Sequence, residues 1–190
     1  VKAGERLAVS IYFPDEVAPP AHAQMVDIAT GDMTVAVELP NPRRARASGI
    51  VSGLEVSGTR ATKILVTFGD SITEGAGASR AMSWPDQLGR LLAADPKGRC
   101  WAVGNVGISG NRLLSQGRGP AALARFDRDV LGMPNATHVV ILEGINDIGN
   151  VRDPAKEWHP PAADLIAAYE QLLSRAKVRG LKVIFGTLLP

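Results

Sequence analysis

From Lys63 onward, short apolar runs alternate with stretches that have a helical pattern. The runs lie at residues 64–68, 101–106, 138–142 and 183–185. Because they are apolar at successive positions, they are typical of strands covered on both faces of a parallel sheet. Helices are expected between them, at about residues 83–92, 120–131 and 164–179, and Gly180 stands at the C-terminal stop of the last. The alternation predicts an α/β domain.

The first 60 residues follow a different pattern. Apolar residues alternate with other residues at 7–13 and again at 35–39, which is the period of half-buried strands. Proline- and glycine-containing turns punctuate these runs. We therefore expect a β-rich N-terminal subdomain, part of a β-sandwich, over residues 1–60, and the α/β domain over 61–190. Arg43, Arg44 and Arg46 are interpreted as a solvated loop within the subdomain.

Charge and cysteine content exclude several classes of function. The 21 basic and 19 acidic residues are spread along the chain, which gives no electrostatic footprint for nucleic acid. No apolar run approaches the roughly 18 residues that a membrane span needs. Cys100 is alone and leads into an apolar run, so it is interpreted as a buried structural thiol. No metal site is expected, and composition does not determine the compartment.

Three polar, glycine-containing turns follow the first three predicted strands. They are Gly-Asp-Ser-Ile-Thr-Glu-Gly at 69–75, Asn-Val-Gly-Ile-Ser-Gly-Asn at 105–111 and Glu-Gly-Ile-Asn-Asp at 143–147. The carboxyl ends of parallel strands meet at one edge of a sheet, where such folds bind their ligands. Acyl transfer needs a hydroxyl nucleophile and fixed donors around one developing oxyanion, and these turns contain both kinds of group.

The three turns, in this order, resemble the sequence blocks of the SGNH (GDSL-type) serine hydrolase and esterase superfamily. The resemblance extends from Lys63 to Pro190 and implies a flavodoxin-like, three-layer α/β/α fold. It makes Ser71 the nucleophile. The backbone N–H groups of Ser71 and Gly110 and the side chain of Asn146 would form the oxyanion hole. It implies a small-molecule carboxylic ester as substrate, of a lipid, a small alcohol or an acetylated sugar, and no cofactor.

The remaining polar residues of the turns are given supporting roles. Asp70, Asn111 and Asp147 are expected to organise the turns by hydrogen-bonding backbone amides. Glu143 is interpreted as a strand-end residue near the pocket. A β subdomain before the hydrolase domain is similar to the arrangement in some secreted bacterial members, including carbohydrate esterases, so only the resemblance favours a secreted or periplasmic location and a deacetylase role.

The catalytic base is the point of departure from the superfamily, which places it in an Asp-x-x-His motif after the fifth strand. The 190 residues contain no such motif. Of the three histidines, His138 is interpreted as structural, His22 lies in a proline-rich stretch, and His159 precedes the long helix as a weak candidate. The sequence is therefore expected to be the front part of a longer hydrolase, and this chain alone is expected to be inactive.

Two alternatives from other functional classes stay open. The first is a non-catalytic ligand-binding pseudoenzyme that has lost its Asp-His pair. The second is a flavodoxin-like phosphate or nucleotide binder, because glycine-rich turns at helix starts bind anions. Against the second reading, the sequence has no Gly-x-x-x-x-Gly-Lys-Ser/Thr loop.

Overall fold

The computed structural model describes residues 7–17, 24–47, 51, 53–55, 62–78, 82–94, 96, 101–149 and 159–188. The chain divides into two compact units, Val1–Ser57 and Gly58–Pro190. Each unit is described by itself. The predictions made for His22 and Cys100 lie outside the described residues.

In the first unit, the described residues contain one two-stranded antiparallel sheet. It pairs β1 (Gln24–Ile28) with β2 (Arg43–Ala47), and Val26 lies opposite Ala45. The strands predicted at 7–13 and 35–39 are wrong, because neither segment pairs with another strand there. Alternation alone cannot make a strand without a partner, and the side chains of Val35 and Val37 are almost fully exposed.

The arginine cluster of this unit is also placed differently from the sequence prediction. Arg43 and Arg44 belong to strand β2 rather than to a loop. Arg44 lies 3.6 Å from the carboxylate of Asp27 on the paired strand, and both side chains are exposed. An exposed pair of this kind contributes little to stability.

The second unit is built on a parallel four-stranded sheet of order β4-β3-β5-β6. Its strands are β3 (Lys63–Gly69), β4 (Trp101–Asn105), β5 (Ala136–Leu142) and β6 (Lys182–Phe185). All three pairings are parallel. The four predicted strands and the parallel sheet are therefore confirmed.

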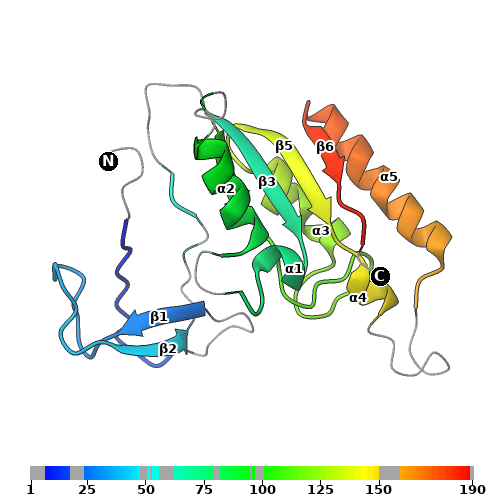
Figure 1. Cartoon of the computed structure of the whole chain (residues 1–190). Helices are drawn as coiled ribbons and strands as arrows, with labels where there is room; N and C mark the ends of the chain where they lie inside the picture. Colours follow the sequence, from blue (N-terminus) through cyan, green and yellow to red (C-terminus); the bar gives the residue numbers. More distant parts are fainter. Residues whose placement is uncertain are drawn as a thin grey trace. The chain divides into compact units, whose positions relative to one another are not determined.

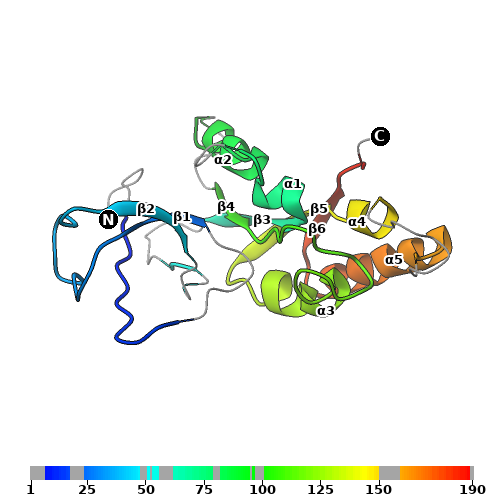
Figure 2. The ribbon, with the colours of Figure 1, turned by 90° about the horizontal axis from the view of Figure 1, so that it is seen from below.

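Helices cover both faces of this sheet. They are α1 (Ser71–Glu74), α2 (Trp84–Ala94), α3 (Ala122–Phe126), α4 (Ile145–Ile148) and α5 (Ala162–Val178), and α3 continues as a π-helical turn, η1 (Asp127–Leu131). In Figures 1 and 2, α1 and α2 lie on one side of the sheet and α3 and α5 on the other. The predicted three-layer arrangement is confirmed.

The core lies between the sheet and the layer that contains α3, η1 and α5. Val66 and Phe68 of β3 and Val139 and Ile141 of β5 are at most 1% exposed, because alternate residues of these strands face that layer. Phe126 of α3 meets Phe68 edge-on, with ring centroids 5.3 Å apart. No described helix is both long and apolar enough to cross a membrane.

The strand order creates a switch point at the centre of the sheet. From β3 the chain moves outward to β4 on one side, and it then returns past β3 to form β5 on the other. Connections that run in opposite directions leave a crevice at the carboxyl ends of the two central strands, and open α/β sheets bind ligands there. The turn after β3 and the turn after β5 therefore occupy the expected position of a site.

Candidate active site

The first turn places Ser71 at the start of a short helix. Asp70 caps this helix, because its Oδ1 accepts a hydrogen bond from the backbone N–H of Ile72 at 2.9 Å. Gly75 ends the helix in the left-handed conformation, with φ of 94°. The chain thus turns sharply from β3 into α1 and leaves Ser71 half-buried at the sheet edge.

The second turn is hydrogen-bonded to the first. Asn105 donates from Nδ2 to the carbonyl of Thr73 at 2.8 Å, and the N–H of Ile108 donates to the carbonyl of Gly69 at 2.9 Å. Gly110 follows in this turn with φ of 73°, a conformation that favours glycine. These bonds fix the Gly110 turn against the turn that carries Ser71.

The third turn is hydrogen-bonded to the second. Asn146 of α4 donates from Nδ2 to the carbonyl of Asn111 at 2.9 Å. The carboxylate of Asp147 accepts hydrogen bonds from the backbone N–H groups of Leu113 at 2.7 Å and Leu114 at 3.2 Å. Bonds therefore join the turns that carry Ser71, Gly110 and Asn146, although these segments are far apart in sequence.

The supporting roles expected for three polar residues have different outcomes. Asp70 and Asp147 accept hydrogen bonds from backbone amides, as predicted. Asn111 acts otherwise, because its side chain donates to the carbonyl of Pro120 at 2.8 Å and accepts from Arg125 at 2.8 Å. A side-chain amide can donate and accept at once, so Asn111 connects two segments rather than capping one.

Arg125 of α3 is a site residue that the sequence reading missed. Its side chain is fully buried, and it donates to the carbonyls of Gly69 at 3.0 Å and Val106 at 2.7 Å. It also bonds to Asn111 and forms an ion pair with Asp129 at 3.0 Å. Burial lowers the pKa of Arg125, and Asp129 opposes this shift. The Arg-x-x-x-Asp spacing was the available signal, but that spacing is also common on solvated helix faces.

Glu143, at the end of β5, is a buried carboxyl group beside this arginine. Burial raises its pKa to about 8, and the neighbouring Asp70 adds to the rise. Arg125 lies 3.8 Å from its Oε2 and acts in the opposite direction, but Oε2 has no hydrogen-bond partner among the described residues. The carboxyl group is therefore mainly protonated at neutral pH.

Two further acids and a tyrosine share this environment. Burial raises the pKa of Asp70 and of Asp147, and the backbone amides that they accept from oppose the shift. Tyr169 of α5 donates its hydroxyl to the carbonyl of Glu143 at 2.6 Å, and burial raises its pKa to about 12. Within the part of the chain that the structure describes, no three His, Cys, Asp or Glu side chains are arranged to hold a metal ion.

The two described histidines, His138 and His159, belong to different parts of the fold. His138 is in the first half of β5, near the amino edge of the sheet, and its ring packs against Trp101 with centroids 4.7 Å apart. Burial lowers its pKa, and Lys182 and Lys63 add to this shift. His159 is exposed just before α5. The structural role expected for His138 agrees with this packing.

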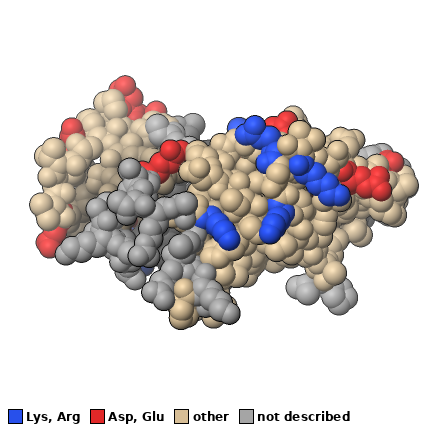
Figure 3. Space-filling model, turned by 90° about the horizontal axis from the view of Figure 1, so that it is seen from above, with Lys and Arg blue, Asp and Glu red and all other residues tan. Residues whose placement is uncertain are grey.

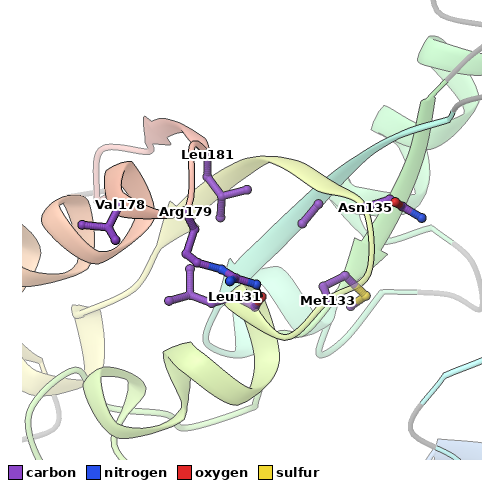
Figure 4. A pocket seen from close by; sticks show the side chains of 7 residues that line it. Leu131, Met133, Asn135, Val178, Arg179 and Leu181 are labelled. Atoms are coloured by element: carbon purple, nitrogen blue, oxygen red, sulfur yellow. Dashed lines mark hydrogen bonds between the residues drawn. The ribbon is translucent and has the colours of Figure 1, made fainter.

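A cavity of about 280 Å³ lies at the opposite edge of the sheet. Seven residues line it: Leu131, Met133, Asn135, Ala136, Val178, Arg179 and Leu181. Figure 4 shows their side chains between the end of α5 and the segment that leads into β5. These residues precede β5 or β6 or, in the case of Ala136, begin β5, whereas Ser71 follows β3, so the cavity is separate from the candidate active site.

The contact between the first two turns can be tested with a small substitution. We expect Gly107→Ala to destabilise the second unit by about 1–3 kcal/mol, because a Cβ atom at Gly107 would lie 2.3 Å from the backbone nitrogen of Glu74. Urea unfolding followed by tryptophan fluorescence measures this, since all three tryptophans lie in Gly58–Pro190.

Gly89→Ala is the matched control for that substitution. A Cβ atom at Gly89 would make an ordinary contact at 3.7 Å with Val103, and alanine is the better helix former. We expect it to stabilise the unit by roughly 0.5–1 kcal/mol. If the two substitutions shifted the unfolding midpoint equally, the close approach of the turns would be contradicted.

The switch-point sheet and its three joined turns define the class of protein: the second unit has the SGNH hydrolase fold. The chain belongs to the GDSL-like Lipase/Acylhydrolase family, whose sequence model matches residues 67–190. No curated protein matches the sequence.

Similar solved structures are esterases. The SGNH-hydrolase family esterase AlinE4 is 21% identical, with a TM-score of 0.55 over 70% of this chain and 63% of that one. Axe2, an acetyl xylan esterase from Geobacillus stearothermophilus, is 26% identical, with a TM-score of 0.53 over 64% of this chain and 58% of that one. The chain thus spans less than two thirds of the length of either protein.

Proposed function

We propose that the chain is a serine ester hydrolase that forms an acyl-enzyme on Ser71. The observation that carries the proposal is the joining of three turns at the switch point of the sheet, each with one of the required groups. Ser71 would supply the nucleophile, and donors from all three turns would hold the oxyanion of the tetrahedral intermediate. Each such donor is typically worth about 3–4 kcal/mol of activation free energy.

The state of the backbone donors supports this role. Among the described residues, no protein group accepts a hydrogen bond from the N–H of Ser71 or of Gly110. A donor that is fixed but unpaired can bond to an oxyanion without first losing another partner. The side-chain amide of Asn146 carries two N–H groups, and the carbonyl of Asn111 orients it.

The substrate class is proposed from the same site and from the relatives. A serine nucleophile together with an oxyanion hole catalyses the hydrolysis of carboxylic esters, and we propose small esters as the substrates. The acetyl xylan esterase at 26% identity makes an acetylated carbohydrate the sharper candidate. Figure 3 shows several basic side chains on the α/β unit with acidic side chains near some of them, and the proposal assigns no role to these charges.

The need for a catalytic base can be tested by adding a general base to the assay solution. The 190 residues contain no Asp-x-x-His, and His138 and His159 are placed as described above. We expect the 190-residue chain to hydrolyse p-nitrophenyl acetate with only the roughly 10³- to 10⁴-fold advantage over water that binding and an oxyanion hole supply. Added imidazole, acting as a general base on Ser71, should raise that rate.

Imidazole also attacks activated esters directly, so Ser71→Ala serves as the blank at every imidazole concentration. The proposal requires an imidazole-dependent increase in the wild-type chain that exceeds the increase in Ser71→Ala. Equal increases in the two proteins would favour the non-catalytic alternative. Full-rate hydrolysis without imidazole would instead point to His159, and His159→Ala would then abolish it.

A further inference from the structure

The side chain of Arg125 bonds to groups next to the turn that carries Ser71 and within the turn that carries Gly110. It lies on α3, is fully buried, and its guanidinium stacks over the ring of Phe68 at 4.1 Å. A buried guanidinium needs partners for its five N–H groups, because an unsatisfied buried donor is costly. The groups that accept hydrogen bonds from Arg125 therefore show which segments this buried side chain holds in place.

The partners of Arg125 lie next to the proposed oxyanion donors in sequence. The carbonyl of Gly69, 3.0 Å from Nη2, is two residues before Ser71. The side chain of Asn111, 2.8 Å from Nε, follows Gly110 directly. The carbonyl of Val106, 2.7 Å from Nη1, belongs to the same turn.

The third donor is reached through one intermediate residue. The backbone carbonyl of Asn111 accepts the hydrogen bond from Nδ2 of Asn146 at 2.9 Å. Because Arg125 holds the side chain of Asn111, it also restricts the carbonyl that orients the Asn146 amide. All three proposed donors are thus connected to one side chain.

We propose that Arg125 is the positioning residue of the oxyanion hole, which sets the mutual placement of the turns that carry Ser71, Gly110 and Asn146. The inference rests on the proposed function, since only a reaction with an oxyanion needs that placement. Arg125 acts through these turns and does not itself touch substrate. Its planar fork reaches separate acceptors at fixed angles, whereas the single ammonium of lysine does not.

The charge balance around Arg125 fits a permanent cation. Asp129, at 3.0 Å on the same helix, supplies a partly buried counter-ion. Glu143 is nearby but mainly protonated, so it leaves the carbonyl oxygens as the principal acceptors on the other side. Arg125 is therefore held in the core by Asp129 while it donates toward the turns.

The test compares Arg125→Lys with Arg175→Lys. Arg175 is a close match, because it also bonds to a backbone carbonyl, that of Leu123 at 2.8 Å, and lies over the Phe126 ring, but within the described part of the chain no hydrogen bond joins it to the three turns. With imidazole as base and p-nitrophenyl acetate as substrate, we expect Arg125→Lys to lower Ser71-dependent kcat about 100-fold with KM nearly unchanged. Arg175→Lys should leave kcat within about twofold.

A second readout does not need activity. In nitrogen-15 NMR spectra, the Gly110 amide and the Asn146 side-chain amide should shift in Arg125→Lys and keep their positions in Arg175→Lys. If Arg125→Lys fails to fold, Arg125→Met/Asp129→Asn replaces the buried arginine and its counter-ion by neutral side chains, and a folded protein with the same two shifts supports the proposal.

The outcomes separate this inference from the proposed function. Unchanged NMR positions in the Arg125 variants would overturn the positioning role, whatever the activity. A kcat loss equal to that of Arg175→Lys would also overturn it, because a general loss of stability would then explain both. Shifted NMR positions without any Ser71-dependent hydrolysis in the wild type would support the positioning of the turns and reject the esterase function.

Discussion

Ser71→Ala is expected to remove ester hydrolysis from the protein while leaving its fold intact. In the proposed mechanism only Ser71 forms the acyl-enzyme, so its loss should lower kcat by at least roughly 10³-fold. Ser71 is half-buried at the first position of α1, and its side chain has no hydrogen bond that stabilises the fold within the described residues. Unfolding free energy should therefore change by less than about 0.5 kcal/mol.

The measurement uses the protein as its native gene encodes it, assayed on p-nitrophenyl acetate, together with labelling by a fluorophosphonate. Ser174→Ala, on the exposed side of α5, is the control and should keep both activity and labelling. If Ser71→Ala kept more than a small fraction of turnover, the nucleophile would have to be another residue.

Glu143→Gln is expected to stabilise the protein at alkaline pH and to leave it nearly unchanged at acid pH. The folded state holds the Glu143 proton up to about pH 8, whereas an ordinary glutamate loses it near 4.5. Between these values the folded state binds more protons than the unfolded state, so stability falls as pH rises through this window. Above pH 8 the whole penalty applies, and it is on the order of 5 kcal/mol because the pKa is raised from 4.5 to about 8. Glutamine keeps the neutral shape and removes the penalty.

Urea unfolding at pH 5, 7 and 9 measures the difference between the variant and the wild type. That difference should be close to zero at pH 5 and grow toward pH 9. Glu170→Gln, an exposed position on α5, is the control and should show no such growth. A difference that did not depend on pH would mean that Glu143 is ionised in the folded state across the whole range.

The second unit could be predicted because its signals are local and repeated. The runs that became β3 and β5 are apolar at successive positions, and a central strand needs that pattern because helices cover both of its faces. The three turns were found because each follows a strand and carries glycine where the backbone takes a positive φ, as at Gly110 and Gly144. Both signals are properties of short sequence windows.

The remaining features depend on contacts that no short window contains. Arg125 lies in a helical pattern in which an arginine is normally solvated. It is buried because Gly69 and Val106, which are distant in sequence, lie against it and accept its hydrogen bonds. Helix faces were misjudged for the same reason. Leu91 and Ile166 fit the apolar stripes of α2 and α5, yet they are 69% and 57% exposed.

The bonds that join the three turns also constrain how the site can form during folding. They link residues 32 positions apart between Asn105 and Thr73, 35 apart between Asn146 and Asn111, and 56 apart between Arg125 and Gly69. Closing such loops costs chain entropy that local structure does not repay, so contacts of this kind form slowly. The proposed oxyanion hole should be among the last parts to assemble, and detachment of α3 from the sheet should disrupt it at all three turns together.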